Sequence, residues 1–439
     1  MRYKPFYLLA LILVSPIFYF WSKSSWDLLG VDTESTLIAL GRLAGLLGVY
    51  LVLWQLLLIG RVKWIEKYIG LDKLANLHHY NGFFGLLFVV LHGLMILFAY
   101  ASLSNWSIWL QLKQFIFVFE DTLSAIVALT LLIGIVLLSI AIVRKRMKYE
   151  WWYLTHLFTY FAILIAFGHQ IELGSSLQNP AFQGYWYFWY AFVFGNLIGY
   201  RFIRPAFLFW KHDFTVEKVV QETPSTVSVY ITGKRMGEYN FEAGQFAFYR
   251  FFQPGFWLEK HPFSYSAAPN GKYIRITVKN LGDFSTRLSG LKVGTKVTIE
   301  GPHGVFTANF AQSGKFLLTA GGVGITPLRS LIDVLVKKQQ DIILLYGNRT
   351  ENEIIFKDEL EELKIKFPNL KVVHVLSGEE NFSGEKGNID REKIARLVPD
   401  LKERDVYLCG PAAMTKKLLN EVVSLGINKS QLHFEKFNL

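Results

Sequence analysis

Long apolar runs limit what this chain can fold into more than any other feature of its 439 residues. Six runs, all before about residue 205, are long enough to cross a hydrocarbon core of roughly 30 Å. They cover about 5–22, 36–60, 76–100, 121–143, 151–170 and 184–203. After them, polar and apolar residues alternate at the density of a water-soluble protein. The sequence therefore predicts six membrane-spanning helices followed by a large soluble part.

Basic residues mark one side of that membrane. They gather in the loops after the second, fourth and sixth runs, at Arg61, Lys63, Lys67 and Lys73, at Arg144, Lys145, Arg146 and Lys148, and at Arg201, Arg204 and Lys211. The opposite loops carry only Lys23 and Lys113 as basic residues. The positive-inside rule then predicts a multi-pass protein of the plasma membrane with both termini in the cytoplasm. The first run follows MRYK and has no small-residue cleavage site after it, which is typical of an anchor rather than a cleaved signal peptide.

Composition excludes several classes of protein. The cytoplasmic loops of a membrane protein explain the net charge of +11, so we expect the lipid bilayer as a partner and no nucleic acid. The single cysteine, Cys409, excludes an internal disulfide, a Cys-rich zinc site, a Cys-ligated iron–sulfur cluster and haem attachment through C-x-x-C-H. We expect no obligatory protein partner.

Histidines in the third and fifth runs are the strongest functional signal, because an ionisable side chain in hydrocarbon is costly unless something binds it. In the third run, the spacing from His78 to His92 returns to within about 40° of the same helix face, whereas His79 would lie about 140° away from that face. The fifth run repeats the arrangement with His156 and His169, although their spacing fits an ideal helix poorly.

Two helices that run the same way, each with an inner and an outer histidine, predict two stacked pairs: His78 with His156, and His92 with His169. Two axial imidazoles per site and no thiol fit b-type haem. Two stacked haems would carry electrons across the whole membrane, which a single haem would not. The alternative interpretation is that four buried histidines bond to backbone carbonyls or polar neighbours.

The same residues carry a resemblance to a known family. His78, Gly82 and His92 form H-x3-G-x9-H, and with His156 and His169 the pattern resembles the ferric reductase-like transmembrane domain over about 36–203. Ferric-chelate reductases and NADPH oxidases share that domain. The resemblance therefore implies a transmembrane oxidoreductase with two haems.

Between about 206 and 310, short alternating stretches such as STVSVYITG predict a small antiparallel β-barrel. HPFSYS at 261–266 and LGDFSTRL at 281–288 resemble the two flavin-binding stretches of the ferredoxin reductase-like family. The resemblance implies FAD, with Ser264 bonding near flavin N5 and Phe263 packing beside the cofactor. It also assigns His261 and Pro262 to the flavin stretch, and assigns the pyrophosphate to Lys279, Gly282, Ser285 and Thr286.

From about 311 to 439, strands and helices alternate, which predicts a doubly wound α/β domain. GGVGITP follows the buried strand KFLLTA and opens a helix with Pro327 at its first position. With CGP at 409–411, this turn resembles the nicotinamide half of ferredoxin reductase-like proteins. The resemblance implies a dinucleotide site formed by Gly321, Gly322, Gly324, Thr326, Pro327, Gly410 and Pro411.

Three further residues are assigned around that site. Cys409 would lie by the nicotinamide, the alternative being a buried small apolar residue. Arg349, in YGNRT at the end of the second strand, is placed to meet a 2′-phosphate, which favours NADPH while leaving NADH possible. In the family a near-terminal aromatic covers the flavin ring where nicotinamide must bind, and Phe437 is the match, with Asn438 and Leu439 after it.

The prediction is thus a membrane protein of three parts: a six-helix transmembrane di-haem domain over 1–205, an antiparallel β-barrel FAD domain over 206–310, and a doubly wound α/β NAD(P)H domain over 311–439. Electrons would pass from cytosolic NADPH through FAD and two b-type haems to an external acceptor. We expect O2, giving superoxide, with a ferric chelate as the alternative. Arg42, near the outer end of the second run, would stabilise the nascent anion or pair with a haem propionate. A membrane haem sensor with an inactive reductase half is the competing hypothesis from another class.

Overall fold

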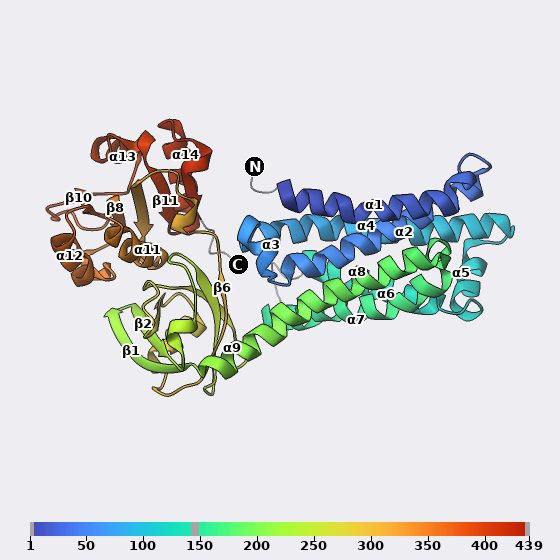
Figure 1. Ribbon diagram of the computed structural model, residues 1–439, viewed down its shortest axis with the longest axis horizontal. Helices are drawn as coiled ribbons and strands as arrows, with labels where there is room; N and C mark the ends of the chain where they lie inside the picture. The colour runs from blue at the N-terminus through green and yellow to red at the C-terminus, as the bar shows by residue number, and fades with distance from the viewer. Residues whose placement is uncertain (1–3, 142–148, 435–439) are drawn as a thin grey trace. The chain divides into compact units, whose positions relative to one another are not determined.

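The computed structural model describes residues 4–141 and 149–434 and contains two compact units (Figure 1). The first unit comprises Met1–Ile65 and Lys73–Tyr200, and the second comprises Glu66–Asp72 and Arg201–Leu439. The basic residues predicted at Arg144, Lys145, Arg146 and Lys148 lie outside the described residues.

The first unit consists of helices that run side by side (Figure 1). The long ones are α1 (Lys4–Ser25), α2 (Thr33–Ile59), α4 (Leu71–Leu103), α6 (Thr122–Ala141), α7 (Tyr149–Leu173) and α8 (Pro180–Ile198). Within the described ranges, five helices are long and apolar enough to cross a membrane: α1, α2, α4, α6 and α7.

The sixth predicted span corresponds to α8, which is not one of those five. It is a helix of 19 residues, rich in Trp, Tyr and Phe, and includes Gln183 and Asn196. Aromatic rings with polar atoms lower mean hydropathy although they pack well between helices. That α8 crosses the membrane therefore stays a prediction.

Short elements complete the first unit and its borders. They are η1 (Trp26–Leu28), α3 (Lys63–Ile69), α5 (Ile108–Phe117) and η2 (Ser175–Gln178). Polar side chains define several helix starts: Asp32 accepts a hydrogen bond from the Ser35 N–H at 2.6 Å, and Asn179 accepts from Ala181 at 3.0 Å. These caps satisfy N–H groups that have no partner within the helix.

A π-helical turn (Gly199–Ile203) and α9 (Arg204–His212) lead into the flavin half of the second unit. Its strands are β1 (Thr215–Thr223), β2 (Thr226–Thr232), β3 (Phe246–Phe251), β4 (His261–Ser264), β5 (Ile274–Lys279) and β6 (Val297–His303). They form two antiparallel sheets, β1-β2-β5 and β4-β3-β6, which the isolated bridges Thr215–Lys296 and Tyr265–Ile276 join. One buried apolar cluster, which includes Val229, Phe251 and Ile299, fills the space between them.

The remainder of the second unit is a parallel sheet with the strand order β10-β9-β8-β7-β11-β12. The strands are β7 (Lys315–Gly321), β8 (Asp341–Asn348), β9 (Leu370–Leu376), β10 (Glu385–Lys386), β11 (Asp405–Cys409) and β12 (Leu432–Phe434). One face packs against α11 (Ile325–Lys337) and α12 (Lys357–Lys366), and the other against α13 (Arg391–Leu397) and α14 (Ala412–Ser424). From β7 the chain adds β8, β9 and β10 on one side of β7, and then returns to add β11 and β12 on the other side. The strand order therefore reverses between β7 and β11.

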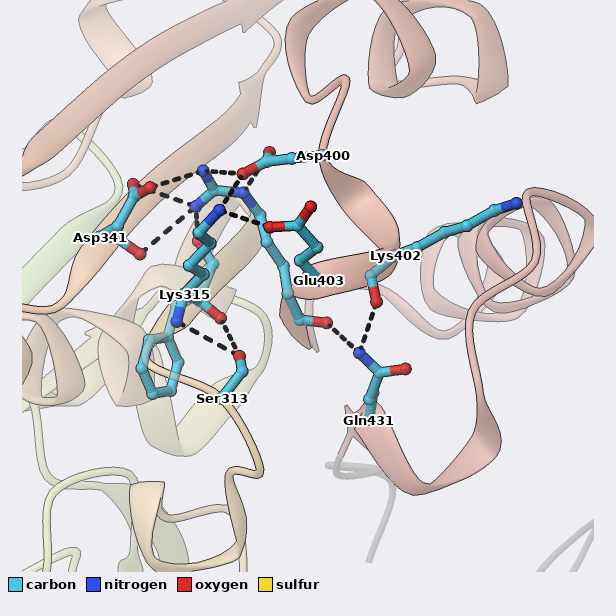
Figure 2. Close-up of polar contacts among 9 residues, drawn as sticks. Ser313, Lys315, Asp341, Asp400, Lys402, Glu403 and Gln431 are labelled. Carbon is cyan, nitrogen blue, oxygen red and sulfur yellow. Dashed lines mark hydrogen bonds and ion pairs between the residues drawn. The ribbon is translucent and has the colours of Figure 1, made fainter.

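Charged side chains hold the amino ends of these parallel strands together (Figure 2). The buried guanidinium of Arg404 donates to both oxygens of Asp341, at 3.1 and 2.8 Å, and to both oxygens of Asp400, at 2.7 and 2.9 Å. Lys315, at the start of β7, pairs with Asp400 at 3.3 Å and with Glu403 at 2.5 Å. Hydrogen bonds from Arg404 are the main reason why the pKa of Asp400 lies below its ordinary value.

A short segment from the predicted loop between the second and third spans belongs to the second unit. The buried carboxylate of Glu66 accepts hydrogen bonds from His303 Nδ1 at 2.8 Å and from the Gly304 N–H at 2.9 Å. Leu71 packs beside Phe246 and Phe248 of β3. This loop segment is therefore part of the flavin half of the protein.

Candidate redox cofactor sites

Four histidines of the first unit form two pairs between α4 and α7. The ring centroids of His78 and His156 are 6.1 Å apart, and those of His92 and His169 are 6.3 Å apart. A metal–imidazole bond is about 2.0 Å and the ring nitrogen lies about 1.1 Å from the centroid, so two rings on opposite sides of one metal have centroids about 6 Å apart. Both separations are compatible with two imidazoles that would bind one iron between them.

Hydrogen bonds from α2 and α6 orient three of these rings. Nδ1 of His92 bonds to the Gly41 carbonyl at 2.8 Å, and Nδ1 of His78 bonds to the Gln55 carbonyl at 3.3 Å. Because a carbonyl only accepts, Nδ1 carries the hydrogen in both rings and Nε2 keeps its lone pair for a metal. Nδ1 of His156 lies 3.4 Å from Ser139 Oγ.

The neighbouring His79 is not part of a pair. Its side chain is exposed and its ring contacts Tyr80, at a centroid distance of 5.5 Å. The structure therefore brings His78, not His79, to His156.

Glycines permit the close approach of α2 and α4 at these pairs. A Cβ atom on Gly45 would lie 2.8 Å from Nδ1 of His92, and one on Gly82 would lie 2.3 Å from the side-chain amide of Gln55. Gly45 is therefore packed against the ring of His92, whereas a side chain in place of Gly82 would displace only the end of the Gln55 side chain. Within the described residues no group of three or more His, Cys, Asp or Glu side chains is arranged to hold a bare metal ion. The donor sets fit two ligands of a metal whose other positions are filled by a macrocycle.

Arg42 lies on α2 next to Gly41, whose carbonyl holds His92. Its Nη1 is 3.4 Å from Ser25 Oγ, and Tyr100 lies within electrostatic range of the guanidinium. Arg42 is thus connected to the outer histidine pair through one backbone carbonyl.

The predicted flavin stretch forms β4 and an aromatic group beside it. The ring of His261 lies on that of Phe284, with centroids 3.9 Å apart, and Phe263 stacks near Phe284 at 6.1 Å. Pro262 pairs with Phe248 in the sheet, and Ser264 is buried opposite Phe246. These contacts place a flat aromatic surface and a hydroxyl on one strand.

The predicted pyrophosphate residues surround the start of α10 (Asp283–Arg287). The Ser285 hydroxyl accepts hydrogen bonds from the Leu281 and Gly282 N–H groups at 2.9 and 3.0 Å. Thr286 donates to the Gly282 carbonyl at 2.9 Å. In this structure the hydroxyls therefore close the turn. Lys279, at the end of β5, pairs with Glu353 of the nucleotide half at 3.4 Å.

An ion pair that lies beside this turn was not predicted from the sequence. Glu259 accepts a hydrogen bond from Arg287 at 2.6 Å and lies 3.2 Å from Nε2 of His261. Burial raises the pKa of Glu259, but the hydrogen bonds from Arg287 and His261 outweigh burial and keep that pKa below its ordinary value. Arg287 stands inside the quoted LGDFSTRL stretch, which was the available signal, whereas Glu259 belongs to no motif.

The two glycine-containing loops of the nucleotide half meet at the carboxyl ends of β7 and β11. A Cβ atom on Gly324 would lie 2.3 Å from the Cys409 carbonyl oxygen, and one on Gly410 would lie 3.1 Å from the Gly321 nitrogen. In contrast, a Cβ on Gly322 would meet nothing within 4 Å, and φ of Gly322 is +52°. The loops flank the position where the strand order reverses, which is where open α/β sheets bind ligands. Gly322 is the glycine that leaves its backbone open to a ligand.

The other predicted nucleotide residues lie around this junction. Thr326 donates to the Val323 carbonyl at 3.0 Å, and Pro411 precedes α14. Pro327 is the third residue of α11, so the expectation that it would be the first was wrong. Its missing N–H is still one of the backbone N–H groups of the first turn that have no hydrogen-bond partner within the helix. Arg349 follows β8 and is exposed.

Cys409 is buried in the apolar cluster that lies between the sheet and α11. A thiol beside the nicotinamide stays a prediction, as does the role of Phe437, which lies outside the described residues.

Three segments of the chain match known families. Residues 44–167 match the ferric reductase like transmembrane component, residues 214–307 match an FAD-binding domain, and residues 318–419 match the oxidoreductase NAD-binding domain. The chain therefore combines a ferric reductase-like transmembrane domain with an FAD-binding domain and an NAD-binding domain. The combination is the architecture of the NADPH oxidase and ferric reductase family, as the resemblance in the sequence predicted.

Curated relatives match part of the chain. The NADPH nitrate reductase of Emericella nidulans is 34% identical over 172 residues, 35% of this chain and 20% of that protein. A plasma membrane-associated coenzyme Q6 reductase of Saccharomyces cerevisiae is 32% identical over 161 residues, 35% of this chain and 52% of that protein. Flavohemoprotein B of Dictyostelium discoideum is 29% identical over 259 residues, 52% of this chain and 60% of that protein. The chain thus spans a fifth of the first relative and little more than half of the other two.

Solved structures match about half of the chain. The FAD/NAD-binding domain of a nitric oxide dioxygenase from Vibrio cholerae is 24% identical with a TM-score of 0.46, covering 51% of this chain and 96% of that one. A cytochrome P450 reductase from Amycolatopsis is 23% identical with a TM-score of 0.46, covering 51% of this chain and 68% of that one.

Proposed function

We propose that the protein passes electrons from NADPH on the cytoplasmic side through FAD and two b-type haems to an acceptor on the outer side, most favourably O2, which becomes superoxide. The observation that carries the proposal is the pair of histidine–histidine separations, 6.1 and 6.3 Å, between the same two helices. When bound, FAD accepts a hydride and releases single electrons, and haem iron transfers them one at a time. The competing sensor hypothesis does not account for a nucleotide turn that leaves Gly322 open.

The histidines would hold the two haems at different depths. His78 and His156 serve the inner site, and His92 and His169 serve the outer one. His92 lies about 21 Å beyond His78 along α4 at 1.5 Å per residue, so the two sites together would extend across most of the hydrocarbon core. The carbonyls of Gln55 and Gly41 keep Nε2 of His78 and His92 available for iron.

The second unit would bring NADPH to FAD. The open backbone at Gly322 would accept the pyrophosphate of NADPH next to the start of α11, where N–H groups without a helical partner favour an anion. Arg349 would meet the 2′-phosphate, which favours NADPH over NADH. Ser264 would donate a hydrogen bond to the flavin, and the ring of Phe263 would pack beside it.

Two acceptors compete in the proposal. With His92 and His169 both bound to the iron of the outer haem, O2 would need only an accessible edge of that haem, because outer-sphere electron transfer requires no open iron site. Arg42 would lower the cost of the anion that forms there. A ferric chelate is the second candidate, and the match of residues 44–167 to the ferric reductase like transmembrane component favours it.

Haem content tests the central assignment. The purified protein should contain two haems per FAD, and His92→Ala should lower haem to about half. The matched control is His79→Ala, which should leave both haems because His79 is exposed. Unchanged haem in His92→Ala, or loss of a haem in His79→Ala, would contradict the assignment. Reporter fusions at each terminus test the predicted cytoplasmic location of both ends.

A further inference from the structure

The connection between α4 and α6 contains a ten-residue helix, α5, whose exposed side is apolar. Trp109 is 65% exposed and Phe117 is 80% exposed. Five more large apolar side chains of the same connection are exposed: Trp106, Ile108, Leu110, Val118 and Phe119. So many exposed large apolar side chains on one short connection indicate an interaction site rather than a surface in contact with water.

The polarity of α5 is the reverse of that of a helix on a soluble protein. Gln111 is 1% exposed and is the one buried residue of the helix. Trp109, Lys113 and Phe117 are four residues apart and therefore lie along one line of the helix, on its exposed side. A helix in water turns its apolar side inward and its polar side outward. The reversed arrangement indicates that the exposed side of α5 faces a less polar environment than its buried side, which packs against the protein.

Chain connectivity fixes where α5 lies. It begins five residues after Leu103, the end of α4, and α6 begins five residues after Phe117. Each connection spans at most about 18 Å. Both α4 and α6 are long and apolar enough to cross a membrane, whereas ten helical residues cover about 15 Å and cannot. The helix is thus confined to the membrane surface at one end of these two spans.

Its inner side is attached to the ends of the spans. Phe115 contacts Tyr100 of α4, with ring centroids 5.8 Å apart. The Thr122 hydroxyl at the start of α6 donates to the Phe115 carbonyl. These contacts keep the side that carries Trp109 and Phe117 turned away from the bundle.

We propose that α5 lies within the membrane–water interface and binds lipid through the side that carries Trp109, Lys113 and Phe117. Tryptophan and phenylalanine favour the boundary between headgroups and acyl chains. Lys113, whose Nζ is 5.5 Å from the centre of the Trp109 ring, is long enough to extend its charge to the headgroups. Because α5 has one basic and no acidic residue, its binding should depend little on anionic lipid.

Fluorescence quenching in lipid nanodiscs tests this placement. The fluorescence of Trp109 is obtained as the difference in tryptophan emission between the wild-type protein and the Trp109→Phe variant. In phosphatidylcholine carrying bromine near the carboxyl end of its acyl chains, this contribution should fall about twice as much as in lipid brominated near the methyl end. Aqueous acrylamide should quench it weakly, and added phosphatidylglycerol should change nothing.

Two reference positions make the result decisive. Trp189 is fully buried in the first unit, so the difference with Trp189→Phe should respond weakly to every quencher. A tryptophan introduced as Ile365→Trp, at an 81% exposed position of the second unit, should respond to acrylamide and not to brominated lipid. If acrylamide quenches Trp109 as it quenches the tryptophan at position 365, α5 lies in water and the lipid proposal is wrong. If Trp109 is protected like Trp189 and Trp109→Asp changes the oligomeric mass, α5 binds a second copy of the chain and the lipid proposal is also wrong.

Discussion

The three glycines of the GGVGITP turn have different surroundings, which indicates different roles for them. Gly324 packs against the Cys409 carbonyl, and Gly321 is packed against Met414, whereas Gly322 has open space beside it. Sequence reasoning treated the three glycines alike because their spacing does not reveal which of them faces another loop. The structure assigns packing to two of them and leaves the third for a ligand.

This difference leads to a prediction with its own matched control. Gly324→Ala should lower the thermal stability of the nucleotide half strongly, since its Cβ would lie 2.3 Å from a backbone oxygen. Gly322→Ala should cost only about 1 kcal/mol for its positive φ but should raise the KM for NADPH about tenfold, because the methyl group occupies the proposed pyrophosphate position. Thermal unfolding and steady-state reduction of a soluble dye measure the two effects. Equal KM values in Gly322→Ala and the wild type would exclude that position from the nucleotide site.

Among the secondary-structure elements, the loop segment with Glu66 shows what sequence reasoning could not find. Glu66 and His303 are 237 residues apart, and neither belongs to a motif. In the sequence Glu66 is one acid within a basic loop, and only the folded chain shows that its carboxylate is buried against β6. Periodicity and motif spacing did reveal α4, α7 and the strand–turn–helix around GGVGITP, because those signals are local.

Removing one partner of this buried pair should destabilise the second unit. Glu66→Leu and His303→Leu should each cost about 3 kcal/mol, because the remaining polar side chain would stay buried after losing the hydrogen bond between them. The double variant Glu66→Leu with His303→Leu should lose less than the sum of the single variants. Glu361→Gln is the matched control, since Glu361 pairs with Lys364 on an exposed helix surface and should cost almost nothing. Additive losses in the double variant would show that the two side chains act independently.

The Arg404 cluster at the amino ends of the strands predicts a pH dependence. The pKa of Asp400 is lowered in the folded protein, so its ion pair contributes stability above the pKa of the unfolded chain and loses it as the pH falls through the folded pKa. The melting temperature of Arg404→Met should therefore lie below that of the wild type at pH 7 by a nearly constant amount down to about pH 5. Below about pH 4 the two values should converge. A difference that grows with acidity would have the wrong sign for this cluster.

At the scale of the whole molecule, the three segments that match known families follow one another in the order that the sequence predicted. Apolar length revealed the membrane helices, and the change to alternating strands and then to strand–helix repeats revealed the two soluble folds. The exception is α8, in which aromatic residues replace the aliphatic ones that make a span evident. The acceptor could not be predicted, because O2 needs no binding motif and leaves no signal in the sequence.

The acceptor is decided by one assay and one variant. With FAD and NADPH, the purified protein should consume NADPH under air and reduce cytochrome c in a reaction that superoxide dismutase inhibits. Arg42, connected to the outer pair through Gly41 and His92, would stabilise the anion only as it forms. Arg42→Ala should therefore slow superoxide formation about tenfold while the rate of haem reduction under nitrogen stays close to that of the wild type. If both rates fall together, Arg42 supports the haem itself, as a propionate partner would. If air gives no turnover and a ferric chelate does, the protein is a ferric reductase, and Arg42 is assigned to a haem propionate instead of a nascent anion.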